Sequence, residues 1–270
     1  MEPWLSTCRA AAADLGLLFA SMPTRDEREP VVGAGEGGDE TTAVDAGAEA
    51  AVVARLEALA ATGVGFTLVS EELGERAFGA GGPWRLVLDP IDGSINAKRG
   101  IPFFSLSVAV ADGPTMADVV FGFVHDFGTG EEWTAVRGGG AFLNGEPLGP
   151  QRPKETIEIL SFEATLTSLV ADRVAPMVGL AKRLRIMGSL AITLCQLAAG
   201  RVDAVCSLKP ARSVDIAAAQ LLVREQGLSI GLPDVAESFG AAPLDLRGRS
   251  RVVAAGREAV CDQVYAALCR

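Results

Sequence analysis

An apolar, strand-like run from Trp84 to Leu88 ends in the segment Asp89-Pro90-Ile91-Asp92-Gly93-Ser94. Proline fixes φ and directs the chain away from a strand, and glycine readily closes a turn. Two carboxylates three residues apart are more than a turn needs. The segment is therefore either a turn with redundant signals or a place where oxygen atoms hold a ligand.

A turn in this segment would let the side chains of Asp89 and Asp92 and the carbonyl oxygen of Ile91 converge on one point. Hard cations such as Mg²⁺ prefer oxygen ligands in an octahedral array, and alternating carboxylate and main-chain oxygens supply them. Gly93 and Ser94 would follow with backbone N–H groups at the start of a helix, which suits a phosphate group. The residues alone leave both alternatives open, a redundant turn and metal-assisted phosphate chemistry.

Other acidic residues also follow expected strands or begin a helix. The segment "TLVSEE" delivers Glu71 and Glu72, and "KPARSVDIAAA" places Asp215 in the first turn of a helix. Surface glutamate pairs are common, and an acid in a first helical turn is favoured by the helix dipole alone. Neither feature by itself indicates a site.

Composition excludes several classes of function. The 270-residue chain has a net charge of -10, which disfavours nonspecific binding to nucleic acid or to an anionic membrane. No apolar run approaches the roughly 20 uncharged residues of a membrane span, and no basic leader precedes the apolar N-terminal stretch, so a cytoplasmic location is expected. The five cysteines form no C-x-x-C pair, and a single histidine, His125, weakens any Ser-His-Asp or Cys-His mechanism.

The first 150 residues predict helices followed by mostly antiparallel strands. Residues 1–20 and 41–63 read as helices, with Thr42 as a cap and Gly63 as a stop of the second. Segments 21–40 and 74–83 predict loops. Strands are expected at 64–71, 84–89, 103–111, 118–126, 131–138 and 140–148, the last with an Asn-Gly hairpin turn at 144–145.

After a Pro/Gly-rich stretch near residues 145–156 the pattern changes to alternating strands and helices. Strands are expected at 156–162, 182–188, 202–208 and 251–256, and helices before residue 179, at 189–200, at 213–227 and from about Arg257. Alternation of this kind predicts an α/β unit. We therefore expect an N-terminal α+β subdomain over 1–150, carrying the metal and phosphate motif, and a C-terminal α/β subdomain over 151–270.

The order of "SEE", "DPIDGSIN" and "VDIAAA" resembles the inositol monophosphatase superfamily of Mg²⁺-dependent sugar phosphatases. Further matches in "GDETTAVD", "GIPFFSLSVAVADG", "GGGAFLNGEPL" and "AAGRVDAV" extend the resemblance over essentially the whole chain. "GIPFF", "RIMGS" and "KPARSVD" are most similar to the archaeal-type subgroup, which resembles both inositol-1-monophosphatases and fructose-1,6-bisphosphatases. The resemblance implies an α+β fold built as a layered αβαβα sandwich, two or three Mg²⁺ ions and a homodimer.

The resemblance also implies roles for individual residues. Asp45 would pair with the hydroxyl of Ser94 to orient the attacking water, and Glu71 would join them in catalysis. Asp92, Gly93 and Ser94 would hold the transferring phosphate. The implied metal ligands are Glu71, Asp89, the carbonyl oxygen of Ile91, Asp92 and Asp215.

Three positions depart from the family pattern: Ala97 and Val214 stand where aromatic residues are usual, and the first loop lacks a lysine that is often present. None is a metal ligand, so the departures leave the activity in place and question only a strict preference for inositol phosphates.

The substrate side is expected to hold sugar hydroxyls and, for a bisphosphate, a second phosphate. "KRLRIMGSL" offers basic residues on a strand, and similar proteins suggest Arg185 with the backbone of Gly188, Ser189 and Leu190 as sugar contacts, although a solvated basic strand explains the pattern too. For a distal phosphate the candidates are Lys209, Arg212, Lys98 and Arg99.

The reaction expected is direct hydrolysis of a phosphate monoester by a metal-activated water, with inositol-1-phosphate, fructose-1,6-bisphosphate or both as substrates. The alternatives are a 3′-phosphoadenosine, NADP or histidinol-phosphate phosphatase, and a non-catalytic regulatory protein that keeps the fold. A nucleotide substrate would want an apolar platform for its base, and the sequence shows no clear one.

Overall fold

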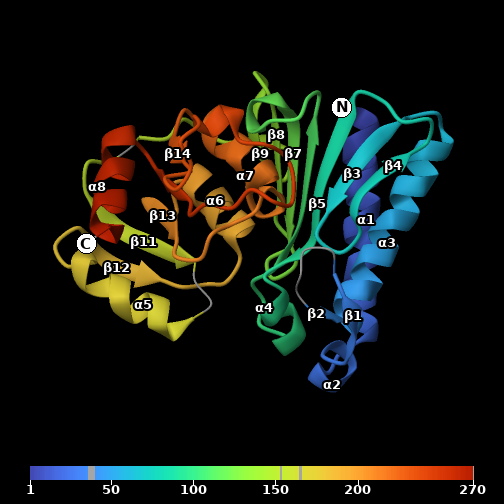
Figure 1. Ribbon diagram of the computed structural model, residues 1–270, viewed down its shortest axis with the longest axis horizontal. Helices are drawn as coiled ribbons and strands as arrows, with labels where there is room; N and C mark the ends of the chain where they lie inside the picture. Colours follow the sequence, from blue (N-terminus) through green and yellow to red (C-terminus); the bar gives the residue numbers. More distant parts are fainter. Residues whose placement is uncertain (36–39, 153, 164–165, 270) are drawn as a thin grey trace.

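The computed structural model describes residues 1–35, 40–152, 154–163 and 166–269. In this part of the chain the elements stack as five alternating layers of helix and sheet (Figure 1). The layered αβαβα sandwich expected from the family resemblance is thereby confirmed. Among the described residues, no helix combines the length and the apolar character that crossing a membrane would require.

The first sheet has eight strands in the order β10-β9-β8-β7-β6-β5-β3-β4. All neighbours are antiparallel except β3 and β5, which run parallel. Asn144 and Gly145 both have positive φ, 52° and 81°, and close the β9–β10 hairpin as the Asn-Gly signal predicts. The strands are β3 (Phe66–Ser70), β4 (Gly74–Phe78), β5 (Trp84–Asp92), β6 (Ser105–Ala111), β7 (Val119–Asp126), β8 (Glu132–Val136), β9 (Gly140–Leu143) and β10 (Glu146–Pro147).

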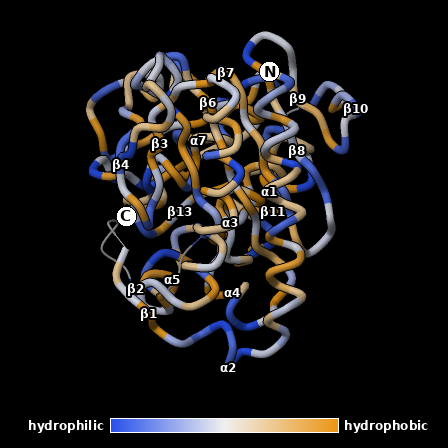
Figure 2. The backbone as a smooth tube through the Cα atoms, turned by 90° about the vertical axis from the view of Figure 1, so that its right-hand side faces the viewer, coloured by the Kyte–Doolittle hydropathy of each residue, from blue (hydrophilic) through white to orange (hydrophobic). Residues whose placement is uncertain are grey.

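Two long helices, α1 (Glu2–Ser21) and α3 (Ala43–Ala61), cover one face of this sheet. Their buried side chains, such as Leu15, Phe19 and Leu56, form one apolar cluster with the sheet. Figure 2 looks onto this layer and shows hydrophobic stretches interrupted by hydrophilic residues along the helices. The pattern is that of helices with one buried face. Thr42 is the N-cap of α3, as predicted.

The second sheet has five strands in the order β12-β11-β13-β15-β14. Strands β12, β11 and β13 are parallel, and β15 runs antiparallel to both β13 and β14. The strands are β11 (Ile157–Glu163), β12 (Ala181–Arg185), β13 (Ala204–Ser207), β14 (Ser229–Gly231) and β15 (Val253–Ala255).

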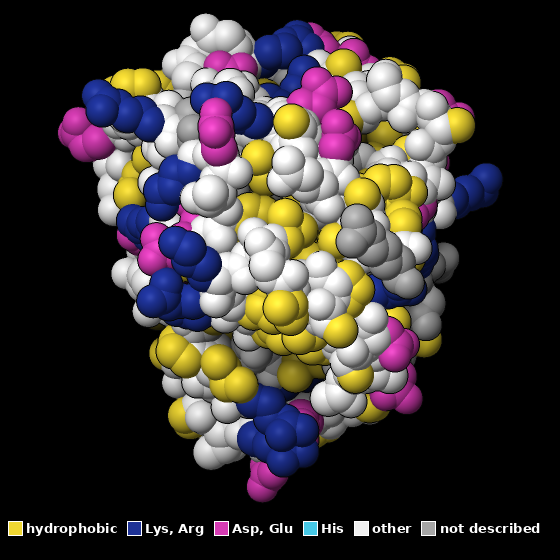
Figure 3. All heavy atoms as spheres, turned by 90° about the vertical axis from the view of Figure 1, so that its left-hand side faces the viewer, with side chains coloured by type: hydrophobic (Ala, Val, Ile, Leu, Met, Phe, Trp, Pro, Cys, Tyr) yellow, Lys and Arg dark blue, Asp and Glu magenta, His cyan; other side chains and the backbone are white. Residues whose placement is uncertain are grey.

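Helices α6 (Leu190–Ala198) and α7 (Ser213–Glu225) fill the space between the two sheets. Their buried residues belong to one apolar cluster that includes side chains of both sheets. Helices α5 (Thr167–Val174) and α8 (Glu258–Leu268) cover the outer face of the second sheet. Figure 3 shows the molecule from this side, where hydrophobic side chains reach the surface between charged ones.

Three expectations about loops and strands are corrected. Segment 21–40 contains α2 (Arg25–Arg28) and β1 (Val31–Ala34), and β1 pairs with β2 (Glu40–Thr42); its residues 36–39 lie outside the described part of the chain. Segment 74–83, expected to be a loop, contains strand β4. Strand β14 lies in a part of the chain where no strand was expected. Strands β4 and β14 are edge strands, which are ordered by backbone hydrogen bonds to one neighbour and so need no apolar pattern.

The turn expected at Pro90 is also corrected. Strand β5 continues through Asp92, and its register against β6 shifts between Asp89 and Asp92. An irregularity of this kind accommodates a proline because the missing N–H falls where the ladder is interrupted. The chain leaves the strand at Gly93, whose φ of 91° is open to glycine, and helix α4 (Ser94–Arg99) begins at the next residue.

Candidate active site

A cavity of about 760 Å³ lies where the ends of β3 and β5 meet the first residues of α4 and α7 and the turn before α6. It collects side chains from both sheets. Three predicted residues are absent from its lining: Arg185 is exposed at the end of β12, Ser189 is buried, and Arg99 pairs with Glu29 at the surface, which removes it as a phosphate candidate. The other sequence-predicted residues line it, namely Asp45, Glu71, Asp89, Ile91, Asp92, Gly93, Ser94, Lys98, Gly188, Leu190, Lys209, Arg212 and Asp215.

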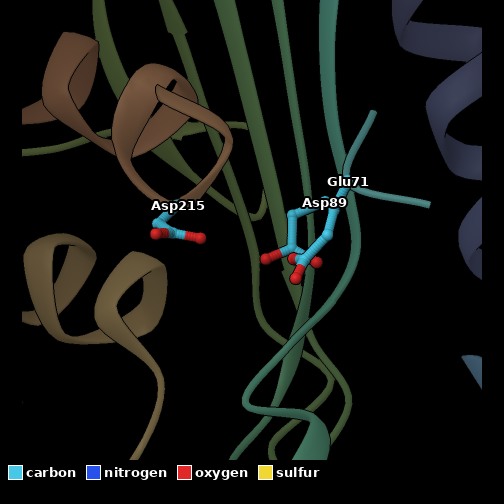
Figure 4. A group of neighbouring side chains, drawn as sticks. All are labelled: Glu71, Asp89 and Asp215. Atoms are coloured by element: carbon cyan, nitrogen blue, oxygen red, sulfur yellow. The ribbon is translucent and has the colours of Figure 1, made fainter. Parts of the chain in front are cut away.

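Three carboxylates meet inside the cavity. Glu71, Asp89 and Asp215 each offer an oxygen atom within 4.8 Å of the other two (Figure 4). Glu71 and Asp89 lie side by side because β3 and β5 are parallel and Ser70 is in register with Leu88. Asp215 faces them from the first turn of α7. The sheet and the helix therefore supply one acidic cluster together.

The charges of this cluster are crowded in a buried place. Burial raises the pKa of Asp89 well above its usual range, and the neighbouring charges of Glu71, Asp92 and Asp215 raise it further. Burial also raises the pKa of Asp215, against the opposing effect of Arg212. A bound cation would offset the repulsion between these crowded carboxylates. A donor set made only of oxygen atoms fits a hard divalent metal ion.

Arg212 provides part of the compensating charge. Its Nη2 lies 2.5 Å from an oxygen of Glu71, and its Nε lies 3.9 Å from Asp215. Its side chain is only 10% exposed. Arg212 therefore lies within the acidic cluster and contacts two of its three members.

Asp92 lines the cavity outside the three-carboxylate cluster and lies at the N-terminus of α6. Its Oδ2 accepts hydrogen bonds from the hydroxyl of Ser189 at 2.5 Å and from the N–H of Ala191 at 2.8 Å. Burial raises the pKa of Asp92 to about 7, and these hydrogen bonds oppose the rise. Ser189 thus holds a carboxylate rather than facing the cavity.

Asp45, in the first turn of α3, is 7% exposed and is held by several donors. Its Oδ2 accepts hydrogen bonds from Thr42 N at 3.1 Å and Thr42 Oγ1 at 2.6 Å, and Lys98 Nζ lies 3.1 Å away. Ser94 lines the same cavity, but among the described residues no hydrogen bond joins it to Asp45.

Glu163 and Arg249 are two charged residues among the cavity residues that the sequence analysis missed. Glu163 ends β11, and its carboxylate accepts hydrogen bonds from Gly188 N at 3.0 Å, Thr193 Oγ1 at 2.7 Å and Ser161 Oγ at 3.2 Å. Burial raises the pKa of Glu163 to about 7. An acid at a strand end was the signal used for Glu71, and it applied here too. Arg249 lies in a loop without any signal.

The rim of the cavity also carries apolar side chains. Ile95 on α4 and Ile186 after β12 line it and are 58% and 48% exposed. They flank a hydrogen bond of 2.7 Å from Asn96 Nδ2 to the carbonyl oxygen of Met187. An apolar wall therefore stands in the same cavity as the cations Lys209, Arg212 and Arg249, although the sequence showed no clear platform of this kind.

Comparison with known proteins agrees with this geometry. The model of the inositol monophosphatase family matches residues 1–269. A fructose-1,6-bisphosphatase/inositol-1-monophosphatase of Methanothermobacter thermautotrophicus is 34% identical, over 91% of this chain and 89% of its own length. A protein of the same description from Archaeoglobus fulgidus is 34% identical, over 94% of each chain.

Solved structures agree as well. A hypothetical protein from Pyrococcus horikoshii, described as having similarities to inositol-1 monophosphatase, superposes with a TM-score of 0.77 at 26% identity, over 97% of this chain and 98% of that one. An inositol monophosphatase–fructose 1,6-bisphosphatase gene product gives a TM-score of 0.80 at 26% identity, over 98% and 99%. The family model matches the chain over residues 1–269, and two relatives are 34% identical over most of the chain. The chain therefore belongs to the inositol monophosphatase family, whose members are metal-dependent phosphatases, and the acidic cluster of its cavity fits that chemistry.

Proposed function

We propose that this protein is a phosphoric monoester hydrolase that uses Mg²⁺ to hydrolyse a sugar or inositol phosphate, with inositol-1-phosphate and fructose-1,6-bisphosphate as substrates. The observation that carries the proposal is the cluster of Glu71, Asp89 and Asp215, with oxygens within 4.8 Å, in one cavity with Asp92, Gly93 and Ser94. The names of the archaeal relatives support the choice of substrates.

The proposed metal ligands are the cluster together with two neighbours from the same strand. Asp92 would contribute Oδ1, since Ser189 and Ala191 already occupy its Oδ2. Ile91 comes between the two aspartates in the chain, where the register of β5 against β6 shifts, and its carbonyl oxygen would be a further ligand. Two or three Mg²⁺ ions would be held by Glu71, Asp89, Ile91, Asp92 and Asp215. When bound, the metal supplies charge neutralisation for the phosphate and lowers the pKa of the attacking water.

The residues around the phosphate hold and orient the reactants. The N–H groups of Gly93 and Ser94 would bind the phosphate oxygens at the start of α4. Asp45 and the Ser94 hydroxyl would orient the attacking water, with Glu71 at its other side. The water oxygen would bond to phosphorus as the bond from phosphorus to the sugar oxygen breaks. One proton of the water would end on the departing oxygen, so that the products are inorganic phosphate and the alcohol.

The substrate beyond the reacting phosphate would lie between the basic and the apolar walls. Lys209, Arg212 and Arg249 would attract a second phosphate, and the backbone of Gly188 and Leu190 would contact hydroxyl groups. Arg185 lies outside the cavity lining, so the proposal gives it no direct contact.

Phosphate release from a substrate panel tests the proposal. The panel is inositol-1-phosphate, fructose-1,6-bisphosphate, NADP and 3′-phosphoadenosine 5′-phosphate, each with Mg²⁺ and with a chelator. We expect Mg²⁺-dependent release from the first two, and loss of release in Asp89→Asn. The control variant is Asp14→Asn, because Asp14 pairs with Arg55 at the surface. Phosphate release from the two nucleotides alone would support the alternative of a nucleotide phosphatase. If no substrate of the panel releases phosphate, the result would support the alternative of a non-catalytic regulatory protein.

The assembly, location and domain division are part of the same proposal. The family resemblance suggests a homodimer. The net charge of -10 disfavours a nucleic-acid or membrane partner, and a location in the cytoplasm is part of the proposal. The change of element pattern near residues 145–156 suggests a boundary between 1–150 and 151–270. Sedimentation velocity tests the dimer, and limited proteolysis tests the boundary.

A further inference from the structure

A lysine contacts the carboxylate proposed to orient the attacking water. Lys98 Nζ lies 3.1 Å from Oδ2 of Asp45, and the side chains are only 18% and 9% exposed. Both residues line the cavity. Both charged side chains are therefore largely shielded from water, whereas the members of a surface ion pair are usually solvated.

The short helix α4 places Lys98 where this contact can be made. Ser94 and Lys98 are four residues apart on α4, so they lie on one side of the helix. Arg99, the next residue, has a side chain that is 50% exposed and pairs at 3.2 Å with Glu29. The two neighbouring cations of "AKR" therefore have different surroundings, one inside the cavity and one at the surface.

The contacts divide the two oxygens of Asp45 between different partners. Oδ2 takes the N–H and the hydroxyl of Thr42 as well as the ammonium of Lys98. Three donors exceed the about two lone-pair sites of one carboxylate oxygen, so Oδ2 has no capacity left for another donor. Oδ1 then remains for a proton donor in the cavity, such as a water molecule or the hydroxyl of Ser94.

We propose that Lys98 is a positioning residue that, together with Thr42, holds Oδ2 of Asp45 and so presents Oδ1 to the attacking water. The inference rests on the proposed function and extends it, because it adds a side chain outside the metal ligands to the machinery that orients the water. Thr42 alone fixes one edge of the carboxylate through the helix cap. The ammonium adds a charged donor from α4, the helix that also carries Ser94, and thereby fixes Asp45 relative to Ser94.

The experiment compares Lys98→Met, Lys98→Arg and the control Arg99→Met in Mg²⁺-dependent phosphate release. A misplaced orienting group lowers turnover rather than binding, so kcat of Lys98→Met should fall about 10- to 100-fold while KM changes less than about threefold. Lys98→Arg keeps a charged donor and should recover most of kcat. Arg99→Met should stay within about twofold of the wild type.

A double-mutant cycle with Asp45→Asn decides whether Lys98 acts through Asp45. In the Asp45→Asn variant, adding Lys98→Met should lower kcat by a further factor of less than about three, because the carboxylate partner of Lys98 has already lost its charge. Calorimetry supplies a readout independent of turnover: the Kd for Mg²⁺ in Lys98→Met should lie within about twofold of the wild type, since Lys98 contacts none of the proposed ligands.

Three outcomes would overturn the inference: wild-type kcat in Lys98→Met, losses that multiply in the double variant, or a rise in KM with kcat unchanged, which would place Lys98 on the substrate. These are distinct from failure of the proposed function. If the wild type releases no phosphate from any substrate of the panel, the proposed function itself fails, and the inference falls with it.

Discussion

Ser189 donates its hydroxyl hydrogen to Asp92 over 2.5 Å, although the two residues are 97 positions apart in the chain. Ser189 is the N-cap of α6, and its Oγ also accepts the N–H of Ile192. The contact joins the helix layer between the sheets to the strand that carries the acidic motif. Asp92 therefore lies at the positive end of a helix dipole, where a buried carboxylate is stabilised.

Ser189→Ala should destabilise the protein and weaken catalysis. The substitution leaves a buried carboxylate oxygen with one donor fewer, so the free energy of unfolding should fall by about 1–3 kcal/mol. Urea unfolding measures the loss. The control is Ser107→Ala, which should be neutral or stabilising, because the buried Ser107 hydroxyl has no hydrogen-bond partner within the described part of the chain. Equal losses in the two variants would contradict the importance of the Asp92 contact.

Arg212→Met should destabilise the metal-free protein more than the Mg²⁺-loaded one. Without the guanidinium, Glu71 loses a cation that lies 2.5 Å from its carboxylate, and the free energy of unfolding in chelator should fall by about 1–3 kcal/mol. A bound cation replaces the missing charge, so added Mg²⁺ should restore more stability to the variant than to the wild type. Urea unfolding with and without Mg²⁺ measures this. Arg183→Met, which breaks an exposed pair with Glu158, is the control.

Acidification should weaken Mg²⁺ binding. Burial raises the pKa of Asp92 to about 7 and that of Asp89 well above its usual range, so both carboxyls hold protons at a pH where ordinary aspartates are ionised. A metal ion must displace these protons. The Kd measured by calorimetry should rise at least about tenfold between pH 8 and pH 6, with proton release on binding. A Kd that does not change with pH would contradict this reading of the cluster.

Glu49 should make the stability of the protein fall as the pH rises. Burial raises its pKa to about 7 from an ordinary value of 4.5, although Ser70 donates a hydrogen bond to it. The folded state therefore holds the proton more tightly, and the stability present below pH 4.5 is lost as the pH rises through 7. Between these limits Glu49→Gln should gain about 2–3 kcal/mol relative to the wild type.

The measurement for Glu49 is urea unfolding of both proteins in chelator from pH 4.5 to pH 8. The difference between the two proteins removes the titration of all other groups. Any constant cost of the buried amide cancels as well. A difference that stays constant with pH would show that Glu49 titrates normally in the folded protein.

Much of the fold follows from local pattern. The alternation of apolar residues and the stop signals at Gly63, Gly200 and Gly227 indicated most helices and strands, because these signals act within a few residues. The edge strands β4 and β14 did not follow, since they are ordered by backbone hydrogen bonds to strands elsewhere in the chain. The shape of the Asp-Pro-Ile-Asp segment did not follow either. Its irregular register is set by pairing with β6, and the local turn signals do not contain that partner.

The sequence by itself determined the chemical kind of the site. Carboxylates at the ends of β3 and β5 and in the first turn of α7 were visible as residue types at element ends, and their order resembled one family. Only the tertiary structure decided which groups touch. Four contacts of the site each join residues that are 25 or more positions apart in the chain. They are Lys98 with Asp45, Ser189 with Asp92, Arg212 with Glu71 and Glu163 with Gly188. The physical reason is that a hydrogen bond or ion pair depends on distances of a few ångströms, and packing of the layers brings these atoms together.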